Sequence, residues 1–412
     1  MVPLGHFPRR AYPDYMPMQF EPDPTDAEFR TEVRKFVSVH KAQGAFRGED
    51  MSPHGVSVAW TRALCARGWL VPHWPSEWGG TDWSPLRRYI MHEELCAARC
   101  PSTDRVALDM VGPIIISYGT SEQKKRYLPR ILTADDIWCQ GFSEPGVGSD
   151  VTAVQTRAVR SRDTYIVDGQ KLWISRAHLA SMMFALVRVS AGSTPQRGLS
   201  FLLIDMHSPG IEVRPIKTID GRHVVNEVFL SEVKVPVENL IGQEEKGWLY
   251  ARALLRNERP LIAGLPWTKR LLNTIKGMVI TRTYSGRALS PGPSVAVRLA
   301  ALEIDLIGLE SLLMRVLHAP QDYASVDVLT SVLKIKGADL NQRAYLLAME
   351  ALGEQALVLQ DAEEASAENA AEGMTEAREL AADFFYSRSA SIAGGTSEIQ
   401  KNMVAAMALE LV

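Results

Sequence analysis

The hydrophobic residues of this chain change their spacing twice, and this change limits the fold more than any other sequence feature. From residue 21 to about 137, apolar residues recur every three to four positions, as at Phe29 and Val33. From about 138 to 245 the period shortens to two, and from 246 to the end the helical period returns. Helical, strand and helical segments in this order predict separate domains rather than one α/β sheet.

We therefore predict a mixed α and β multidomain protein. An N-terminal arm covers residues 1–20, an α-helical domain 21–137, a β-sandwich or barrel domain 138–245, and an α-helical bundle 246–412. The strands expected in the middle domain are rich in Val, Ile, Leu and Phe. They occupy residues 156–160, 165–168, 183–189, 199–204 and 224–235.

Local signals add finer expectations. Thr25 with Glu28, and Thr120 with Gln123, have the spacing of capping boxes at helix N-termini. The pair Asp168-Gly169 is typical of a tight turn between strands.

Composition excludes several classes of protein. The formal net charge of -3 provides no global field for nucleic acid or an anionic membrane. There is no apolar run of about 18 residues, so no transmembrane helix is expected. The four cysteines lack paired zinc spacing, which predicts reduced thiols in a cytoplasmic protein and no metal site.

Two motifs lie in the middle region. The first contains Glu144-Pro145-Gly146-x-Gly148-Ser149-Asp150, whose glycines allow close backbone approach to a polar ligand. On composition alone, an ordinary structural turn is the favoured interpretation. The second runs from Asp168 to Ser175 and contains Lys171, Trp173 and Ile174. Its alternative interpretation is a tryptophan in the β core followed by a serine on a turn.

Two further motifs lie in the C-terminal region. Glu258-Arg259 stands directly before Pro260, which removes a backbone donor from a helix. A charged, exposed helix face is the alternative interpretation of this pair. The last motif is Gly394-Gly395-Thr396-Ser397-Glu398, in which Thr396 also suits the cap of a final helix.

Together the four motifs resemble those of acyl-CoA dehydrogenases, and the resemblance covers the chain from about residue 25 onward. It implies an FAD cofactor and an acyl-CoA substrate. Ser143 then matches the residue whose hydroxyl bonds flavin N5, Trp173 flanks the flavin, and Ser175 hydrogen-bonds it. The cofactor-binding residues implied by the resemblance are Gln140, Phe142, Ser143, Gly148, Ser149, Trp173, Ser175, Arg282, Gly353, Thr396 and Glu398.

The resemblance also implies where the catalytic base lies. In the best-known branches a glutamate precedes the C-terminal Gly-Thr, but here that position is Gly394. Isovaleryl-CoA and long-chain acyl-CoA dehydrogenases carry their base in a Glu-Arg pair that matches Glu258-Arg259. Glu258 is therefore expected to remove the α-proton while the β-hydride passes to flavin N5. The N–H of Gly394 is expected to bond the thioester carbonyl, and Ser149, Arg259 and Gly395 to contact substrate.

Three departures from the family pattern concern the FAD contacts of a neighbouring subunit. Ser285 replaces the usual phenylalanine in the segment that begins at Arg282, Pro293 replaces a glutamine, and Glu350 stands where a glutamine often faces the pyrophosphate. An acidic side chain near phosphates is unfavourable unless it is paired or turned away. These departures favour a second interpretation, a subunit of a heteromeric dehydrogenase.

The remaining alternatives are a flavin monooxygenase or nitroalkane oxidase-like enzyme on the same fold, and a non-enzymatic assembly role. For the dehydrogenase, the resemblance implies an electron-transfer flavoprotein as electron acceptor and a role in lipid metabolism and β-oxidation. A homotetramer is the expected assembly, with a dimer or heterotetramer as alternatives. No nucleic-acid or membrane partner is expected.

Overall fold

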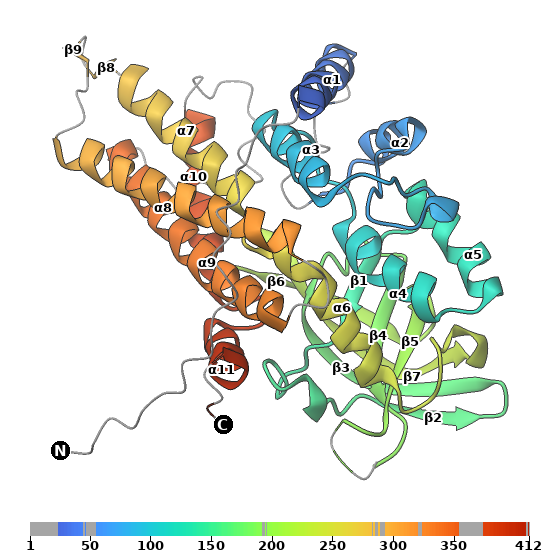
Figure 1. Cartoon of the computed structure of the whole chain (residues 1–412). Helices are drawn as coiled ribbons and strands as arrows, with labels where there is room; N and C mark the ends of the chain where they lie inside the picture. Colours follow the sequence, from blue (N-terminus) through green and yellow to red (C-terminus); the bar gives the residue numbers. More distant parts are fainter. Residues whose placement is uncertain are drawn as a thin grey trace, which may run out of the picture.

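Two helical regions flank a β-sheet in the computed structural model (Figure 1). The structure describes residues 24–43, 46, 55–191, 194, 196–281, 283–284, 287–288, 293–319, 324–353, 374–408 and 411. The predicted arm at residues 1–20 lies outside this part of the chain. The predicted fold class, with helices before and after a middle β region, is confirmed.

The N-terminal region consists of short helices around a tryptophan-rich core. Trp60, Trp69, Trp74, Ile114 and Leu128 are among its buried side chains. The elements are α1 (Pro24–Ala42), α2 (Val58–Arg67), η2 (Ser76–Trp78), α3 (Pro85–Ala97), the π-helix η3 (Val106–Val111), α4 (Gly112–Tyr118) and α5 (Ser121–Leu132).

One of the two predicted capping boxes is correct. Thr120 and Gln123 exchange side-chain and backbone hydrogen bonds at the start of α5, as predicted. The box at Thr25 and Glu28 is wrong, because α1 already begins at Pro24. The Thr25 hydroxyl instead accepts a hydrogen bond from Arg87 of α3, at 3.0 Å.

The middle region forms a seven-stranded sheet, in the order β1-β4-β2-β3-β7-β6 with β5 paired to β4. Strands β1 and β4 run parallel, whereas the β3–β7, β4–β5 and β6–β7 pairs are antiparallel. The strands are β1 (Trp138–Gly141), β2 (Arg157–Ser161), β3 (Thr164–Ser175), β4 (Met182–Arg188), β5 (Leu199–Asp205), β6 (Ile211–Lys217) and β7 (His223–Pro236), with single turns η4 (Val151–Ala153) and η5 (Val237–Asn239).

The tight turn predicted at Asp168-Gly169 is wrong, because both residues lie inside β3. The register between β3 and β7 shifts at Gly169, whose φ is +157°. A Cβ at Gly169 would lie 2.5 Å from Thr156 Oγ1, so the glycine permits a close approach of β3 to the residue that directly precedes β2.

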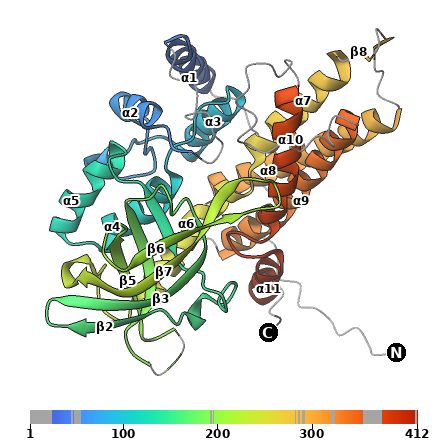
Figure 2. The same cartoon turned by 180° about the vertical axis from the view of Figure 1, so that it is seen from behind.

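The C-terminal region is a helical bundle that extends away from the sheet (Figure 2). Its core includes Leu272, Ile275, Leu333, Leu340 and Leu347. The elements are α6 (Gly247–Ile262), α7 (Leu265–Thr281), the β8–β9 ladder (Thr283–Tyr284 and Arg287–Ala288), α8 (Pro293–His318), α9 (Ala324–Leu352), α10 (Met374–Tyr386), η8 (Ser387–Ser391) and α11 (Ser397–Ala408).

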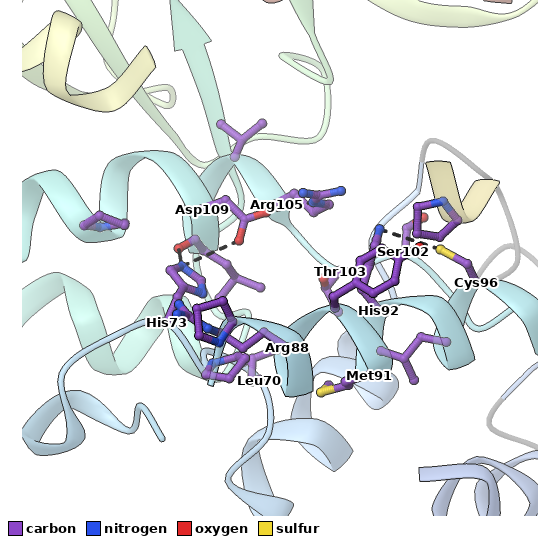
Figure 3. A pocket seen from close by; sticks show the side chains of 18 of the residues that line it. Leu70, His73, Arg88, Met91, His92, Cys96, Ser102, Thr103, Arg105 and Asp109 are labelled. Carbon is purple, nitrogen blue, oxygen red and sulfur yellow. Dashed lines mark hydrogen bonds and ion pairs between the residues drawn. The ribbon is translucent and has the colours of Figure 1, made fainter. Parts of the chain in front are cut away.

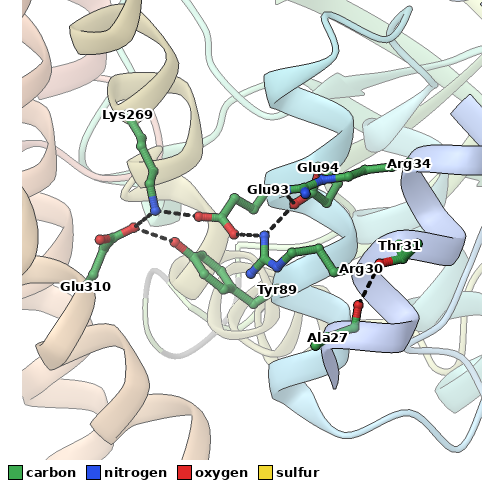
Figure 4. Close-up of polar contacts among 9 residues, drawn as sticks. All are labelled: Ala27, Arg30, Thr31, Arg34, Tyr89, Glu93, Glu94, Lys269 and Glu310. Atoms are coloured by element: carbon green, nitrogen blue, oxygen red, sulfur yellow. Dashed lines mark hydrogen bonds and ion pairs between the residues drawn. The ribbon is translucent and has the colours of Figure 1, made fainter. Parts of the chain in front are cut away.

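A polar network joins the N-terminal helices to this bundle (Figure 4). Glu93 of α3 bonds Arg30 of α1 at 2.5 Å and Lys269 of α7 at 2.6 Å. Lys269 also reaches Glu310 of α8, which accepts a hydrogen bond from the Tyr89 hydroxyl. The network therefore fixes α3 between the two helical regions.

No helix within the described ranges combines the length and the apolarity needed to cross a membrane.

Candidate active site

A buried ion pair joins the two middle motifs. Lys171 of β3 has no exposed surface, and its Nζ lies 2.8 Å from Glu144 Oε1 in the loop after β1. The same ammonium donates to the Leu186 carbonyl at 2.8 Å. Glu144 also accepts bonds from the backbone N–H groups of Gln155 and Thr156. Every oxygen of the carboxylate is thus occupied, which gives Glu144 a structural role.

The protonation of this pair follows from its surroundings. Burial lowers the pKa of Lys171 to about 8, although Glu144 opposes the shift. Burial works against ionisation of Glu144 as well, but Lys171 and the donors around it hold the pKa of the carboxyl below its usual range. Lys171 and Glu144 are therefore both ionised, and their ion pair holds the first motif against β3.

The second motif ends in an irregular stretch that presents Trp173. The β3–β7 register shifts between Lys171 and Ile174, and Trp173 adopts a φ of +62°. Its indole is 57% exposed, unusual for so large a side chain, and Ser175 is exposed at the end of the strand. The buried Asn226 of β7 donates to the Ile174 carbonyl at 3.0 Å and so holds this stretch.

The residues predicted from the first motif differ in exposure. The Phe142 ring is buried against Phe184 and Phe201, and the residue as a whole is only 4% exposed. Gln140 and Ser143 are partly exposed, and the Ser143 carbonyl accepts the Leu172 N–H at 2.9 Å. Gly148 and Ser149 are exposed on the same loop.

Asp104 connects the helical region to the sheet beside these motifs. Its carboxylate accepts the Trp138 N–H of β1 at 2.7 Å and lies 3.4 Å from Arg176, which directly follows β3. Burial raises the pKa of Asp104, and Arg176 offsets part of that shift. This contact fixes the position of η3 against the strands that carry both motifs.

A cavity of about 1000 Å³ opens beside this junction. Ser175 and Val224 border it from the sheet, and Tyr386 from the end of α10. Most of the remaining wall comes from the N-terminal region, namely α2, the loop after it, α3, the segment before η3, η3 and α4, with further residues from the ends of α7, α8 and α9. Figure 3 labels side chains from the N-terminal region, including His73, Arg88 and Asp109. Its volume is at the upper end of the range for small-molecule sites, so it suits a bulky organic group.

The π-helix in the cavity wall depends on a glycine. The N–H of Gly112 bonds to the Ala107 carbonyl, the five-residue spacing of a π-turn. A Cβ at Gly112 would lie 2.2 Å from Trp74 Cζ2, and the Trp74 indole donates to the Leu108 carbonyl at 2.8 Å. Close packing of Trp74 on η3 therefore requires glycine at this position.

Several polar groups face the cavity. Arg105 pairs with Asp109 at 2.7 Å, and His73 lies 3.6 Å from the same carboxylate. Burial lowers the pKa of His92 to about 3, so its imidazole is neutral at physiological pH. His92 Nε2 lies 3.8 Å from Cys96 Sγ, and burial raises the pKa of that thiol to about 12. Arg105 and His73 thus contact the Asp109 carboxylate, whereas His92 and Cys96 are uncharged at physiological pH.

The predicted base lies on α6, which packs against η3. Position 258 follows the buried residues Ala251 and Leu254 by seven and four positions, one face of a helix. The side chains of Glu258 and Arg259 lie outside the described part of the chain.

The C-terminal glycine loop is held by a buried lysine. Gly394 and Gly395 have φ values of +68° and +87°, which favour glycine. Lys334 of α9 is 1% exposed, and its Nζ donates to the Gly395 carbonyl at 2.7 Å. Thr396 caps α11 by accepting the Ile399 N–H, and Glu398 is exposed in the first turn of that helix.

The predicted contacts to a neighbouring subunit are only partly visible. Arg282 and Ser285 lie outside the described residues, Pro293 begins α8, and Gly353 follows α9 with a φ of +60°. Glu350 forms an ion pair with Arg298 of α8. This acidic side chain is therefore already neutralised within the chain.

Sequence reasoning missed the residues that support the motifs. Lys171 was visible as a lysine inside an apolar strand, but its partner depends on which strands are neighbours. Asp104, Asn226 and Lys334 gave no signal, because each contacts a segment distant in sequence. The cavity was also missed, since its wall combines elements from all three regions.

Family models match almost the entire chain. The N-terminal, middle and C-terminal domains of acyl-CoA dehydrogenases match residues 23–135, 139–233 and 245–409. The chain therefore belongs to the acyl-CoA dehydrogenase family of FAD-dependent oxidoreductases.

Individual relatives agree with this assignment. Acyl-CoA dehydrogenase IpdE1 of Mycobacterium tuberculosis is 31% identical over 397 residues, covering 93% of this chain and 97% of the relative. Among solved structures, the Tcur3481-Tcur3483 steroid ACAD has a TM-score of 0.82 at 25% identity, covering 96% of this chain and 100% of its own. The ChsE4-ChsE5 complex from Mycobacterium tuberculosis has a TM-score of 0.78 at 28% identity, covering 96% and 100%.

The residues present fit the FAD that this family uses. The exposed Trp173 offers an aromatic surface for a planar ring, and the exposed Ser175 and Ser149 offer hydroxyl groups that can hydrogen-bond a ligand. An added Cβ at Gly148 would meet nothing within 4 Å, so the loop backbone is open to close approach. Aromatic, hydroxyl and backbone groups of this kind suit an uncharged, hydrogen-bonding ring system.

Proposed function

We propose that this chain desaturates a bulky acyl-CoA between its α and β carbons, with Glu258 as the catalytic base. The observation that supports this best is the shared cavity. Ser175 at the end of the second motif and Tyr386 before the C-terminal motif border one space, and η3 forms its wall against α6. A substrate in this cavity meets residues from the sheet and from both helical regions.

The chemistry divides between cofactor and chain. FAD, when bound, accepts the hydride that leaves the β-carbon. Glu258 takes the α-proton and so acts as the general base of the reaction. The backbone N–H of Gly394 bonds the thioester oxygen and stabilises the negative charge that develops there. The flavin ring would be oriented by Gln140, Ser143, Ser149, Trp173 and Ser175. The rest of FAD would be held by Thr396, Glu398, Gly353 and Arg282. The substrate is contacted by Arg259 and Gly395.

The test is anaerobic reduction of the purified protein by acyl-CoA. A panel of branched, medium-chain, long-chain and steroid side-chain CoA thioesters should bleach the flavin absorbance with at least one member. Glu258→Gln should slow the bleaching at least about 1,000-fold while the oxidised flavin spectrum is retained. Arg252→Gln, on an exposed position of α6, is the matched control. Rapid bleaching by Glu258→Gln would show that another residue is the base.

A second candidate function is that of one subunit in a heteromeric dehydrogenase. Two similar solved structures are named as pairs of different chains, Tcur3481-Tcur3483 and ChsE4-ChsE5. The replacements at Ser285 and Pro293 support an altered neighbour contact. Co-expression with candidate partner chains should then raise the flavin content, whereas a flavin-saturated homotetramer or dimer would contradict this candidate.

We further propose a cytoplasmic enzyme of lipid β-oxidation that passes its electrons to an electron-transfer flavoprotein. The chain's family membership and the apolar parts of the cavity support this role. Reoxidation of the acyl-CoA-reduced enzyme by purified electron-transfer flavoprotein tests it, and oxidation by oxygen alone at the same rate would count against it.

A further inference from the structure

The cavity wall contains one arginine whose charge is not matched. Arg88 of α3 lines the cavity and is partly buried (Figure 3). Its guanidinium has no hydrogen bond or ion pair with any described residue. The two other arginines in the wall differ, because Arg105 pairs with Asp109 and Arg176 pairs with Asp104.

The surroundings of Arg88 offer no substitute partner. Burial lowers the pKa of this guanidinium, and no carboxylate raises it again. Three other titratable groups in the wall are also uncharged or already engaged. His92 is neutral, His73 contacts the Leu108 carbonyl, and Asp327 already interacts with another group. A partly buried cation without a partner is unfavourable, so an incoming acceptor at this point gains more than it would at a solvated arginine.

Besides these polar groups, the cavity wall has an apolar part. Leu70, Met91, Leu95 and Val106 supply aliphatic surface to the same cavity. A saturated hydrocarbon of the right size would fill this surface but leave the five N–H donors of the guanidinium unbonded. The wall therefore suits a largely apolar group that carries an oxygen at one place.

We propose that Arg88 selects acyl-CoA substrates whose acyl group carries an oxygen acceptor, a ketone or a carboxylate, remote from the thioester. This proposal rests on the proposed function, because it takes the cavity as the site of the acyl group. Arg88 is then a specificity-determining residue that touches the substrate but not the reacting carbons.

The test measures equilibrium binding without turnover. Three 3-thia-acyl-CoA analogues of equal length, ending in a methyl group, a methyl ketone and a carboxylate, are titrated into the flavin-loaded protein by calorimetry. The native protein should bind at least one oxygenated analogue about 10- to 100-fold more tightly than the methyl analogue, the range for a hydrogen bond to a charged group. Tighter binding of the carboxylate alone identifies an anionic group, and similar gains for both identify a carbonyl oxygen.

Substitutions then assign the preference to this side chain. Arg88→Met should abolish the preference while leaving affinity for the methyl analogue within about threefold, and Arg88→Lys should restore part of it. Arg87→Met is the matched control, because Arg87 lies on the same helix but bonds Asp26 and Thr25 of α1. Thermal melts of all variants confirm folding.

Two results would overturn the proposal. Equal affinity of the native protein for all three analogues, or equal loss for all three in Arg88→Met, would remove Arg88 as a selector. Neither result affects flavin bleaching by acyl-CoA, so the proposed function would stand. If none of the analogues binds, both the cavity assignment and this proposal fail, even where some acyl-CoA bleaches the flavin.

Discussion

Lys171 Nζ lies 2.8 Å from Glu144 Oε1, and this contact joins the loop of the first motif to the strand of the second. Both side chains are almost fully removed from solvent. The positions of the two motifs that we propose bind the flavin thus depend on a pair that is itself buried away from solvent.

Removing one partner of this pair should destabilise the protein strongly. Lys171→Met leaves the buried Glu144 carboxylate without its cation, and we expect the free energy of unfolding to fall by about 3–5 kcal/mol. The double variant Glu144→Gln/Lys171→Met should recover part of this loss. Urea unfolding followed by circular dichroism measures both effects. The exposed pair Glu212 and Arg214 on β6 provides the control, and Arg214→Met should leave the unfolding midpoint unchanged.

Loss of Lys334 should impair the reaction more than flavin binding. Lys334→Met frees the Gly395 carbonyl, so the adjacent Gly394 N–H loses its fixed position. We expect a 10- to 100-fold slower flavin reduction by acyl-CoA, about 1.4–2.7 kcal/mol of transition-state stabilisation. Stopped-flow absorbance measures the rate. Lys336→Met, on an exposed position of the same helix, should reduce at the native rate, and equal slowing in both variants would contradict the loop-holding role.

His92 should make the protein less stable in acid. Its pKa in the folded protein is about 3, mainly because of burial, and lies below the ordinary value of 6.5. The unfolded chain therefore binds the proton first, and the free energy of unfolding falls as the pH drops from about 6.5 toward 3. One such group contributes at most about 1.4 kcal/mol per pH unit in this window.

The measurement compares urea midpoints of the native protein and His92→Gln between pH 4 and pH 7. The variant should show the shallower pH dependence, with the two curves parallel above pH 7. His207→Gln, at an exposed position in the turn after β5, should follow the native curve. Parallel curves for His92→Gln throughout would mean that the imidazole is not kept neutral by burial.

Gly112→Ala should disturb the cavity wall. The new Cβ meets Trp74 Cζ2 at 2.2 Å and the Ala107 carbonyl at 2.9 Å, neither of which is a flexible chain end. We expect a loss of about 1–3 kcal/mol in unfolding free energy and weaker acyl-CoA binding. Gly308→Ala in α8 is the control, because its Cβ meets nothing within 4 Å and alanine favours helix. A stable, fully binding Gly112→Ala would contradict the importance of the π-turn.

Local patterns in the sequence predicted the order of helices and strands, because the hydrophobic period is a property of each segment alone. The capping box at Thr120 and Gln123 was predictable for the same reason. The prediction of a turn at Asp168-Gly169 was wrong, because this glycine lies within β3 and makes room for Thr156, which directly precedes the neighbouring strand β2. The partner of Glu350 likewise lies 52 residues away, so its ion pair with Arg298 depends on how α8 and α9 pack.

The motifs could be predicted from the sequence, but the residues on other elements that hold the motifs in place could not. Trp173 and Gly394 belong to contiguous motifs, whereas Asn226 and Lys334 act on those motifs from other elements. The role of Glu258 stays a prediction, because it depends on a side chain outside the described part of the structure.

The exposed indole of Trp173 also gives the protein a built-in optical signal. A solvent-facing tryptophan emits at long wavelength, and a flavin stacked beside it would accept that energy and quench the emission. Adding FAD to the apoprotein should therefore dim the red edge of the emission spectrum, whereas the buried Trp60 and Trp138 emit toward the blue. Cofactor loading could then be followed in real time without any attached dye.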